Sequence, residues 1–438
     1  MRITVFSIGT QGDVRPFVAL ALGLQAQGHE VCIASGKSCE ALVRRFGISY
    51  APLTADFLEW MANDPKALQK GLNPLKFVRT ARKALAEMSV DWAEQGLAAA
   101  KGADLLLGNG MVSVLAASLG ESLSIPVVET HLQPVTPCGD IPPMMLKPPK
   151  RPLPGRLNLA LYHSLRVLTW QMLSAAYSPL RRALGLDAIP WYGPYFRRDR
   201  VNHRLLYGFS PTLVTPSSSW PDSVRVAGNW FLDEGQNWQA PTKLAHFLAT
   251  SPADSKPVYI GFGSMLSTET DEFSKIIYQA IKQSGQRAVV ATGWGGLEAS
   301  LLDDDDICVI DAAPHDWLLP QMSMAIHHGG VGTTAAALRA GIPSVVIPFF
   351  GDQPFWAWRL NQLGVAPPGL TRKNITVEQL LAAIHFNLDE AVVRRAAALG
   401  DQMRSEDGVR VAIDQLTAWG LLTSTAMESS QRDVKALS

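Results

Sequence analysis

The chain has 438 residues, of which 47% are hydrophobic and 18% are charged, so it is long enough for roughly two to three domains and apolar enough for buried cores. Its 35 glycines and 29 prolines are ordinary for a globular protein, which excludes fibrous and wholly disordered classes. Lysine plus arginine and aspartate plus glutamate both number 39, so the chain lacks the broad positive field of a nucleic-acid-binding protein.

The first half of the chain alternates strand and helix patterns. Short apolar runs predict four strands, at residues 3–8, 30–34, 104–107 and 126–129. Helical patterns lie at residues 16–27, 75–100 and 112–122, and the turn sequence GTQGD occupies residues 9–13. Strands joined by helices form parallel sheets, so this half is expected to be one helix-covered sheet.

The second half repeats this organisation after a connector rich in proline, serine and tryptophan. Its predicted strands are residues 258–262, 288–292, 307–310, 324–327 and 344–348, and its helical patterns residues 273–283, 333–340 and 390–419. The predicted fold class is α/β, with two Rossmann-like parallel-sheet domains. The expected parts are an N-terminal domain (1–215), a linker (216–242), a second domain (243–400), a terminal helix that crosses back to the first domain (401–422) and a flexible tail (423–438).

The sequence HHGGVGTT, residues 327–334, lies between an apolar strand and a helix. Glycines allow a tight turn with accessible backbone N–H groups, and a helix N-terminus attracts anions, so the motif predicts a phosphate site. His328 and Thr333 add side-chain donors. The alternative is that Gly329 and Gly330 only permit the turn. The spacing departs from GxGxxG and from GxxxxGKS/T, so neither of those nucleotide motifs is supported.

A second polar group follows the next predicted strand. The sequence PFFGDQ, residues 348–353, ends in Asp352 and Gln353, just beyond the carboxyl end of a buried strand, where ligands of open α/β sheets bind. Their acceptors and donors suit neighbouring hydroxyls, as on a sugar. The alternative is that Asp352 serves as a helix N-cap before Pro354.

These motifs, with AAPHDWL at residues 312–318, resemble the donor-binding signature of inverting, nucleotide-sugar-dependent glycosyltransferases. Within that superfamily the chain resembles sterol glucosyltransferases and their bacterial antibiotic and lipid glycosyltransferase relatives, through GTQGDVRP, GNWFLD and GFGSM at residues 9–16, 228–233 and 261–265. The resemblance covers nearly the whole chain and is weakest over residues 55–207. It implies the GT-B fold, in which two Rossmann-like domains face each other across a cleft.

The resemblance also implies a donor site for a nucleotide sugar. It places at the diphosphate Ser264, His328, Gly332 and Thr333, in a loop that also holds Gly330 and Val331. Asp352 and Gln353 would hold sugar hydroxyls. The nucleoside would lie along Ala313 and His315, with Trp294 flanking the base unless it only packs against its glycine neighbours. Thr10 and Gln11 would face donor and acceptor from across the cleft.

Two positions depart from the family pattern. Ala312 stands where many relatives carry a tryptophan that stacks on uracil, and Val331 stands where sterol-type members often carry serine. Uridine and thymidine donors therefore both remain open.

The candidate catalytic residue is Asp13. Glycosyl transfer to an alcohol with inversion needs one acid–base group beside the acceptor oxygen, and similar antibiotic and sterol glycosyltransferases use an aspartate at this place. Asp13 is expected at the tip of the first loop, where the helix N-terminus should lower the pKa of its carboxyl. The alternative is that it only caps a helix that starts near Pro16.

The sequence signals for acceptor-binding residues are less specific than those for the donor site. His131 is a candidate second acceptor-side group, and its alternative is a structural loop residue. Residues 142–154 are proline-rich and carry Lys147, Lys150 and Arg151, and Arg156 opens a long apolar helical stretch. This segment could cover a lipophilic acceptor pocket, pack as core, or lie on an anionic membrane surface.

Other site classes find little support. Four cysteines, Cys32, Cys39, Cys138 and Cys308, are too sparse for a disulfide framework and favour a cytoplasmic protein. No apolar run reaches about 18 residues, so membrane contact is expected to be peripheral at most. The run of aspartates at residues 303–306 fits a solvated turn better than a metal site, and the resemblance implies neither metal nor cofactor.

The expected activity is transfer of a hexose, glucose from UDP-glucose, to a hydroxyl of a lipophilic acceptor such as a sterol, terpenoid or polyketide, with inversion. One alternative is a transferase for a TDP-deoxysugar or rhamnose. A second is a catalytically silent nucleotide-sugar-binding protein.

Overall fold

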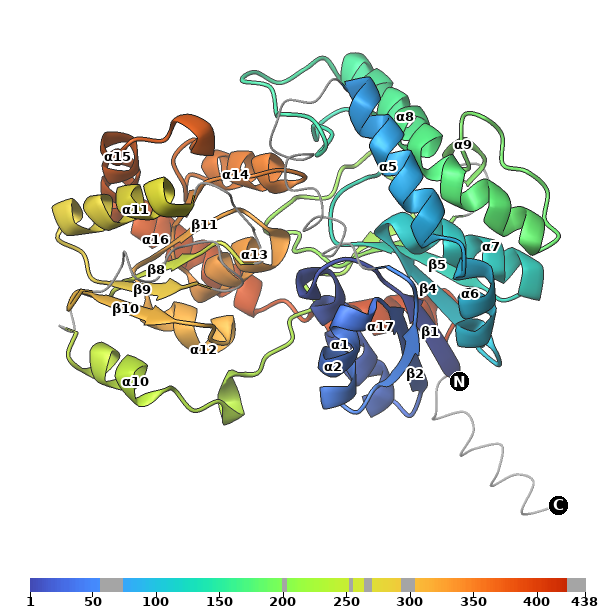
Figure 1. Ribbon diagram of the computed structural model, residues 1–438, viewed down its shortest axis with the longest axis horizontal. Helices are drawn as coiled ribbons and strands as arrows, with labels where there is room; N and C mark the ends of the chain where they lie inside the picture. Colours follow the sequence, from blue (N-terminus) through green and yellow to red (C-terminus); the bar gives the residue numbers. More distant parts are fainter. Residues whose placement is uncertain (56–73, 199–202, 252–254, 264–269, 293–303, 424–438) are drawn as a thin grey trace.

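The computed structural model describes residues 1–55, 74–198, 203–251, 255–263, 270–292 and 304–423. Ser264, Trp294 and all but the first residue of the expected tail lie outside these ranges. The described chain forms two α/β domains, each built on one sheet (Figure 1). The predicted fold class is confirmed.

The N-terminal sheet has seven parallel strands in the order β3-β2-β1-β4-β5-β6-β7. Their bounds are β1 Arg2–Phe6, β2 Glu30–Ser35, β3 Ser49–Pro52, β4 Leu105–Asn109, β5 Val127–His131, β6 Leu205–Tyr207 and β7 Val224–Val226. The four predicted strands are present, and β3, β6 and β7 are additional. Strand β7 pairs with β6 and lies inside the segment expected to be a linker, so the first sheet extends into that segment.

Helices cover both faces of this sheet. Their bounds are α1 Gln11–Ala26, α2 Glu40–Arg45, α5 Pro74–Met88, α6 Trp92–Ala100, α7 Ser113–Leu123, α8 Gly155–Ala183 and α9 Tyr195–Arg198, with short turns η1 Lys37–Cys39 and η2 Gly110–Val112. The pattern predicted over 75–100 is two helices, which a short turn at residues 89–91 separates. Helix α1 begins five residues before its predicted start at residue 16 and continues through Pro16.

The second sheet has five parallel strands in the order β10-β9-β8-β11-β12. Their bounds are β8 Val258–Gly261, β9 Ala288–Ala291, β10 Ile307–Ile310, β11 Met324–His327 and β12 Ser344–Val346. All five were predicted within two residues at either end. The helices are α10 Thr242–Ala249, α11 Thr270–Ser284, α12 His315–Leu318, α13 Val331–Ala340, α14 Gln353–Gln362, α15 Val377–Leu388 and α16 Glu390–Arg404.

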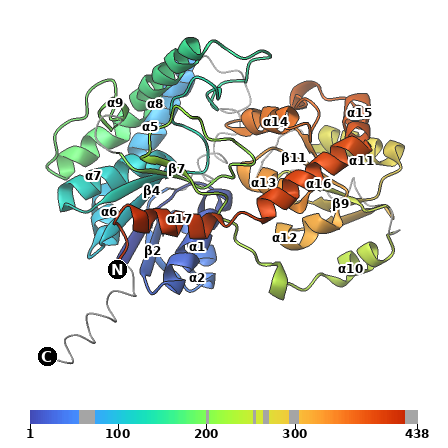
Figure 2. The ribbon, with the colours of Figure 1, turned by 180° about the vertical axis from the view of Figure 1, so that it is seen from behind.

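The last helix, α17 (Gly408–Ala418), lies against α1 of the first domain (Figure 2). Its Ile413 and Leu416 belong to the apolar core of the N-terminal sheet. A Cβ on Gly23 of α1 would stand 2.4 Å from Cγ1 of Val409, so glycine allows the two helices to approach. The chain thus returns from the second domain to the first just before α17.

Candidate functional site

A cavity of about 1490 Å³ lies between the two domains. The first turns of α1 line it on one side, and the segments after β10 and β11 line it on the other. Ligands of open parallel sheets bind at such strand ends. Of the residues predicted from the sequence, those that line the cavity are Gln11, Ala313, His315, Val331, Gly332 and Thr333.

Asp13 lies in the first turn of α1 rather than at the tip of a loop. Its Oδ2 accepts hydrogen bonds from the Thr10 backbone N–H (2.8 Å) and from Thr10 Oγ1 (3.1 Å). The helix begins early because this carboxylate and Thr10 satisfy each other at the N-terminus, as in a capping box. Asp13 therefore stabilises the start of α1 from within its first turn. It is not the N-cap of a helix that starts near Pro16, because Thr10 occupies the N-cap position.

The pKa of Asp13 moves in the direction opposite to the one expected from the helix terminus. Burial raises it to about 6, the negative charge of Asp352 adds to the rise, and the hydrogen bonds from Thr10 only partly offset both. The expectation was wrong because desolvation of this partly buried carboxyl, with the charge of Asp352 of the second domain nearby, outweighs the effect of the helix terminus. A carboxylate with this pKa is a better proton acceptor than an ordinary aspartate.

Asp352 reaches the first domain from the opposite side of the cleft. Its Oδ2 accepts hydrogen bonds from Trp356 Nε1 (2.7 Å) and from Gln133 Nε2 of the N-terminal domain (3.3 Å). Burial raises the pKa of its carboxyl. Asp352 does occupy the N-cap position of α14, but its side chain makes no capping hydrogen bond. The capping alternative therefore does not account for this side chain.

Gln353 has a role that sequence reasoning missed. Its side chain is buried, and its Oε1 accepts hydrogen bonds from the backbone N–H groups of Phe349 (2.7 Å) and Phe350 (3.2 Å). This oxygen holds the loop that presents Asp352. An amide three to four residues after an apolar loop is a weak signal, which explains why the sequence did not reveal it.

The glycine motif forms a tight connection from β11 to α13. Gly329 has φ +89°, a conformation that favours glycine, and a Cβ on Gly330 would stand 2.5 Å from His328 Nε2. The backbone can therefore turn sharply and pack on the His328 ring, with the N-terminus of α13 facing the cavity. Burial lowers the pKa of His328 to about 4, so the ring is neutral near pH 7 and can donate one hydrogen bond.

The cavity wall that contains Ala313 and His315 holds both predicted and unpredicted residues. His315 Nε2 lies 3.2 Å from Tyr259 Oη, and burial lowers the pKa of this histidine to about 4. Ala312 is exposed at the cavity wall. The linker contributes a ring that the sequence did not single out, Trp238, whose ring centre lies 4.8 Å from that of Trp317.

Charged side chains of the linker connect the two domains beside the cavity. Glu234 accepts hydrogen bonds from Arg15 of α1 and from Arg45 of α2. The preceding residue, Asp233, accepts two from Arg339 of α13, at 2.6 and 2.8 Å. No local pattern predicts these ion pairs, because the residues that form them are more than 100 positions apart.

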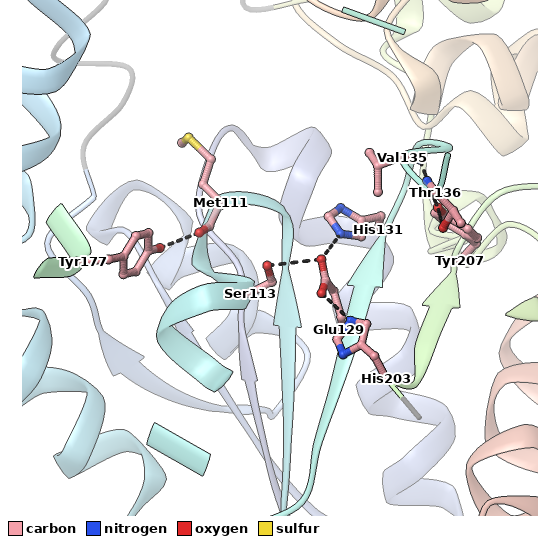
Figure 3. A network of polar contacts seen from close by, with 9 residues as sticks. All are labelled: Met111, Ser113, Glu129, His131, Val135, Thr136, Tyr177, His203 and Tyr207. Atoms are coloured by element: carbon pink, nitrogen blue, oxygen red, sulfur yellow. Dashed lines mark hydrogen bonds and ion pairs between the residues drawn. The ribbon is translucent and has the colours of Figure 1, made fainter. Parts of the chain in front are cut away.

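His131 belongs to a buried polar network at the end of β5 (Figure 3). Its Nε2 lies 2.7 Å from Glu129 Oε1, and His203 Nε2 lies 2.5 Å from Glu129 Oε2. Burial disfavours the charge of Glu129, yet the charges and hydrogen bonds of His203 and His131 outweigh burial and hold the pKa of its carboxyl well below the usual value. His131 is therefore a strand residue held by a carboxylate, not a loop residue, and Glu129 and His203 were missed by sequence reasoning.

The aspartate run after residue 302 forms ion pairs with a lysine. Asp304 and Asp306 lie 3.1 and 2.8 Å from Lys282 Nζ, which fits a solvated turn, while Asp303 lies outside the described residues. Within the described ranges, no group of three or more histidine, cysteine, aspartate or glutamate side chains could hold a metal ion. None of the described helices combines the length and hydropathy needed to cross a bilayer.

Comparisons with known proteins match both halves of the chain. Residues 3–134 match the Glycosyltransferase family 28 N-terminal domain, and residues 298–414 match the Erythromycin biosynthesis protein CIII-like, C-terminal domain. The chain is similar to a sterol 3-beta-glucosyltransferase of Penicillium rubens (34% identity over 95% of this chain and 30% of that protein) and to one of Aspergillus fumigatus (33%, 95% and 30%). It thus spans about 30% of the length of these relatives.

Solved structures share the architecture at low sequence identity. The calicheamicin glycosyltransferase has a TM-score of 0.71 at 16% identity, over 96% of this chain and 98% of that one. A spinosyn rhamnosyltransferase has a TM-score of 0.65 at 21% identity, over 95% and 100%. By its two domain families, its architecture and its sterol glucosyltransferase relatives, this chain belongs to the GT-B glycosyltransferases.

Proposed function

We propose that the chain transfers a hexose, glucose from UDP-glucose, to a hydroxyl of a lipophilic acceptor such as a sterol, terpenoid or polyketide, with inversion. The observation that carries the proposal is that the cavity between the domains is lined by the start of α1 on one side and the start of α13 on the other. Asp13 lies in the first turn of α1, and Asp352 of the second domain is near enough for its charge to raise the pKa of Asp13. The names of the curated relatives, which act on sterols, support the acceptor class and the sugar.

In the proposed reaction the acceptor oxygen attacks the anomeric carbon of the donor. The bond from that carbon to the diphosphate oxygen breaks, and its electron pair leaves with the nucleoside diphosphate. Asp13 orients the acceptor hydroxyl and takes its proton, and this can occur late because positive charge develops on the sugar first. The backbone N–H groups at the start of α13, with His328 and Thr333, hold the leaving diphosphate, and Ser264 is assigned to the same task.

Asp352 is assigned to the sugar in this scheme. Oδ2 already accepts from Trp356 and Gln133, and a carboxylate has further lone pairs for a sugar hydroxyl. Gln353 supports the same loop. Ala313, His315 and Trp294 are assigned to the nucleoside, and Thr10 and Gln11 to the donor and acceptor across the cleft. His131 is the second acceptor-side candidate.

The decisive experiment is a matrix of donors and acceptors with product masses read by mass spectrometry. UDP-glucose with sterol, terpenoid and polyketide alcohols should give hexosylated products of inverted configuration. A second candidate, transfer from a TDP-deoxysugar or TDP-rhamnose, is favoured by Ala312 and by the fold shared with a rhamnosyltransferase that binds thymidine diphosphate. Product only with TDP donors would select it. Nucleotide-sugar binding without any product would instead select the silent binding protein.

The pH dependence of the reaction should report the ionisation of the Asp13 carboxyl. Because burial raises the pKa of this carboxyl to about 6, the base is ionised above that pH and protonated below it. We expect kcat/KM to be level at higher pH and to fall tenfold per pH unit below about 6. Because the charge of Asp352 contributes to the raised pKa, Asp352→Asn should move this acid limb to lower pH. An Asp13→Asn enzyme with an unchanged acid limb would contradict the assignment.

A further inference from the structure

A segment without acidic residues comprises α8 and the loop that precedes it. Residues 141–186 contain seven lysines and arginines and no aspartate or glutamate, although an even spread of the 39 acidic residues over 438 positions would place about four there. Five of these cations are exposed, and four of the five lie in the loop before α8 or in its first turn: Lys147, Lys150, Arg151 and Arg156. Over the ranges that the structure describes, none of the four forms an ion pair. Their charges are therefore available to an external anion.

The loop that carries three of these cations is tied to the helix that carries the fourth. Asn158 Nδ2 in the first turn of α8 donates to the carbonyl oxygens of Cys138 (3.0 Å) and Ile141 (2.6 Å). A Cβ on Gly155 would stand 3.4 Å from the Cα of Gly139, so the two ends of the loop are in contact. Residues 142–154 thus leave and rejoin the chain at one end of α8 (Figures 1 and 2), and three of the cations belong to this loop.

Exposed apolar side chains lie on the same elements. Four of the ten exposed large hydrophobic side chains of the described residues are here: Met145 (60% exposed), Leu157 (49%), Leu168 (54%) and Trp191 (73%). Leu157 and Leu168 are eleven residues apart, about three helical turns, and so share one face of α8. Gln171 Nε2 donates to the Trp191 carbonyl, which places that tryptophan beside the same helix. We call these four side chains and the four cations the α8 surface.

The elements that carry the α8 surface share an apolar cluster with the helix that follows Asp352. Ile141 and Tyr162, at the base of the loop and in α8, belong to the same apolar cluster as Phe355 and Trp356 of α14. Helix α14 is the one that begins directly after Asp352. The elements that carry the α8 surface therefore pack against the helix that starts next to Asp352.

We propose that the α8 surface docks the protein on an anionic phospholipid membrane. The cations would pair with headgroup phosphates. The exposed methionine, leucines and tryptophan would be buried at the boundary between headgroups and acyl chains, as in helices that bind at a bilayer interface. The presence of exposed cations and exposed apolar side chains along the same segment favours a bilayer over a purely acidic partner, which would leave the apolar side chains in water. Docking is separate from the proposed transfer reaction and would bring the cleft to the phase that dissolves a lipophilic acceptor.

The test is sedimentation of the full chain with phosphatidylcholine vesicles, with and without phosphatidylserine. The wild-type protein should bind the anionic vesicles, and binding should weaken as salt is added. Charge reversal by Lys147→Glu, Lys150→Glu and Arg151→Glu should lower the partition coefficient by about 100-fold, since each cation near the surface contributes roughly fivefold. The matched control reverses three exposed lysines on other elements, Lys37→Glu, Lys101→Glu and Lys243→Glu, and should bind nearly normally.

The apolar part of the surface has its own variant. Leu157→Gln with Leu168→Gln keeps the charge and changes only exposed positions, so the protein should keep its thermal midpoint and lose binding several-fold. Equal losses in the two charge-reversed proteins, equal binding to neutral vesicles, or binding to nucleic acid or acidic protein instead of vesicles would overturn the proposal. Vesicle binding needs no donor, so an inactive protein that docks would contradict only the proposed function.

Discussion

Replacing Asp13 with asparagine should leave the protein folded and lower turnover by about 10² to 10⁴-fold, the usual contribution of a positioned general base. The amide oxygen of asparagine can still accept from Thr10, so the start of α1 should persist. Donor affinity should remain nearly normal, because the diphosphate is assigned to the other domain. Single-turnover rate, nucleotide affinity and thermal midpoint measured on one accepted alcohol would check the three expectations.

The stability of this variant separates catalysis from helix capping. A carboxyl whose pKa rises to about 6 on folding binds its proton more tightly when folded, so its contribution to stability is lost as pH rises from about 4 to 6. Above that range Asp13→Asn should therefore be no less stable than the wild type. Asp13→Ala, which loses both bonds to Thr10, should be less stable than the asparagine variant by about 0.5 to 2 kcal/mol.

A matched control is available at another helix start. Asp389 is the N-cap of α16, and its Oδ1 accepts from the backbone N–H of Ala391 at 2.8 Å. Asp389→Asn makes the same chemical change at a cap and should leave turnover unaltered. Near-parental turnover in Asp13→Asn would mean that Asp13 only supports its helix, and His131, held by Glu129, would be the next candidate base.

The donor site should separate into a phosphate part and a sugar part. His328→Ala and Asp352→Ala should each lower kcat/KM for the nucleotide sugar by about 10- to 150-fold, since a hydrogen bond to a charged group is worth roughly 1.5 to 3 kcal/mol. The nucleoside diphosphate product should distinguish them. Its affinity should fall for His328→Ala and stay nearly unchanged for Asp352→Ala, because the product has no sugar for Asp352 to hold. Isothermal titration with the diphosphate checks this.

A conservative substitution of Asp352 separates the loss of activity from a loss of stability in that experiment. Asp352→Ala leaves Trp356 Nε1, on a fully buried ring, without its acceptor and should lower stability by about 1 to 3 kcal/mol. Asp352→Asn can still accept from Trp356, so its loss of activity would reflect the sugar contact and the charge rather than folding. Equal losses of diphosphate affinity in His328→Ala and Asp352→Ala would contradict the assignment of Asp352 to the sugar.

Features that depend on neighbouring residues were predictable from the sequence. Buried apolar runs with turn residues at their ends located β8, β10 and β11, and the glycines between an apolar run and a helical pattern located the turn from β11 to α13. The alternation of strands and helices gave two parallel sheets. Strands β6 and β7, three residues each, were missed because so short a run carries no periodicity of its own and becomes a strand only by pairing.

Features that depend on distant residues were decided by the tertiary structure alone. The sequence selected Asp13 but indicated the wrong direction for its pKa, because desolvation by the folded protein and the charge of Asp352 act through space. It likewise offered His131 without Glu129 and His203, the latter 74 positions away from Glu129, and gave no sign that Glu234 binds Arg15. Local pattern fixes which backbone forms, because helix and strand preferences act over a few residues. Desolvation and charge are set by whatever the completed fold brings into contact.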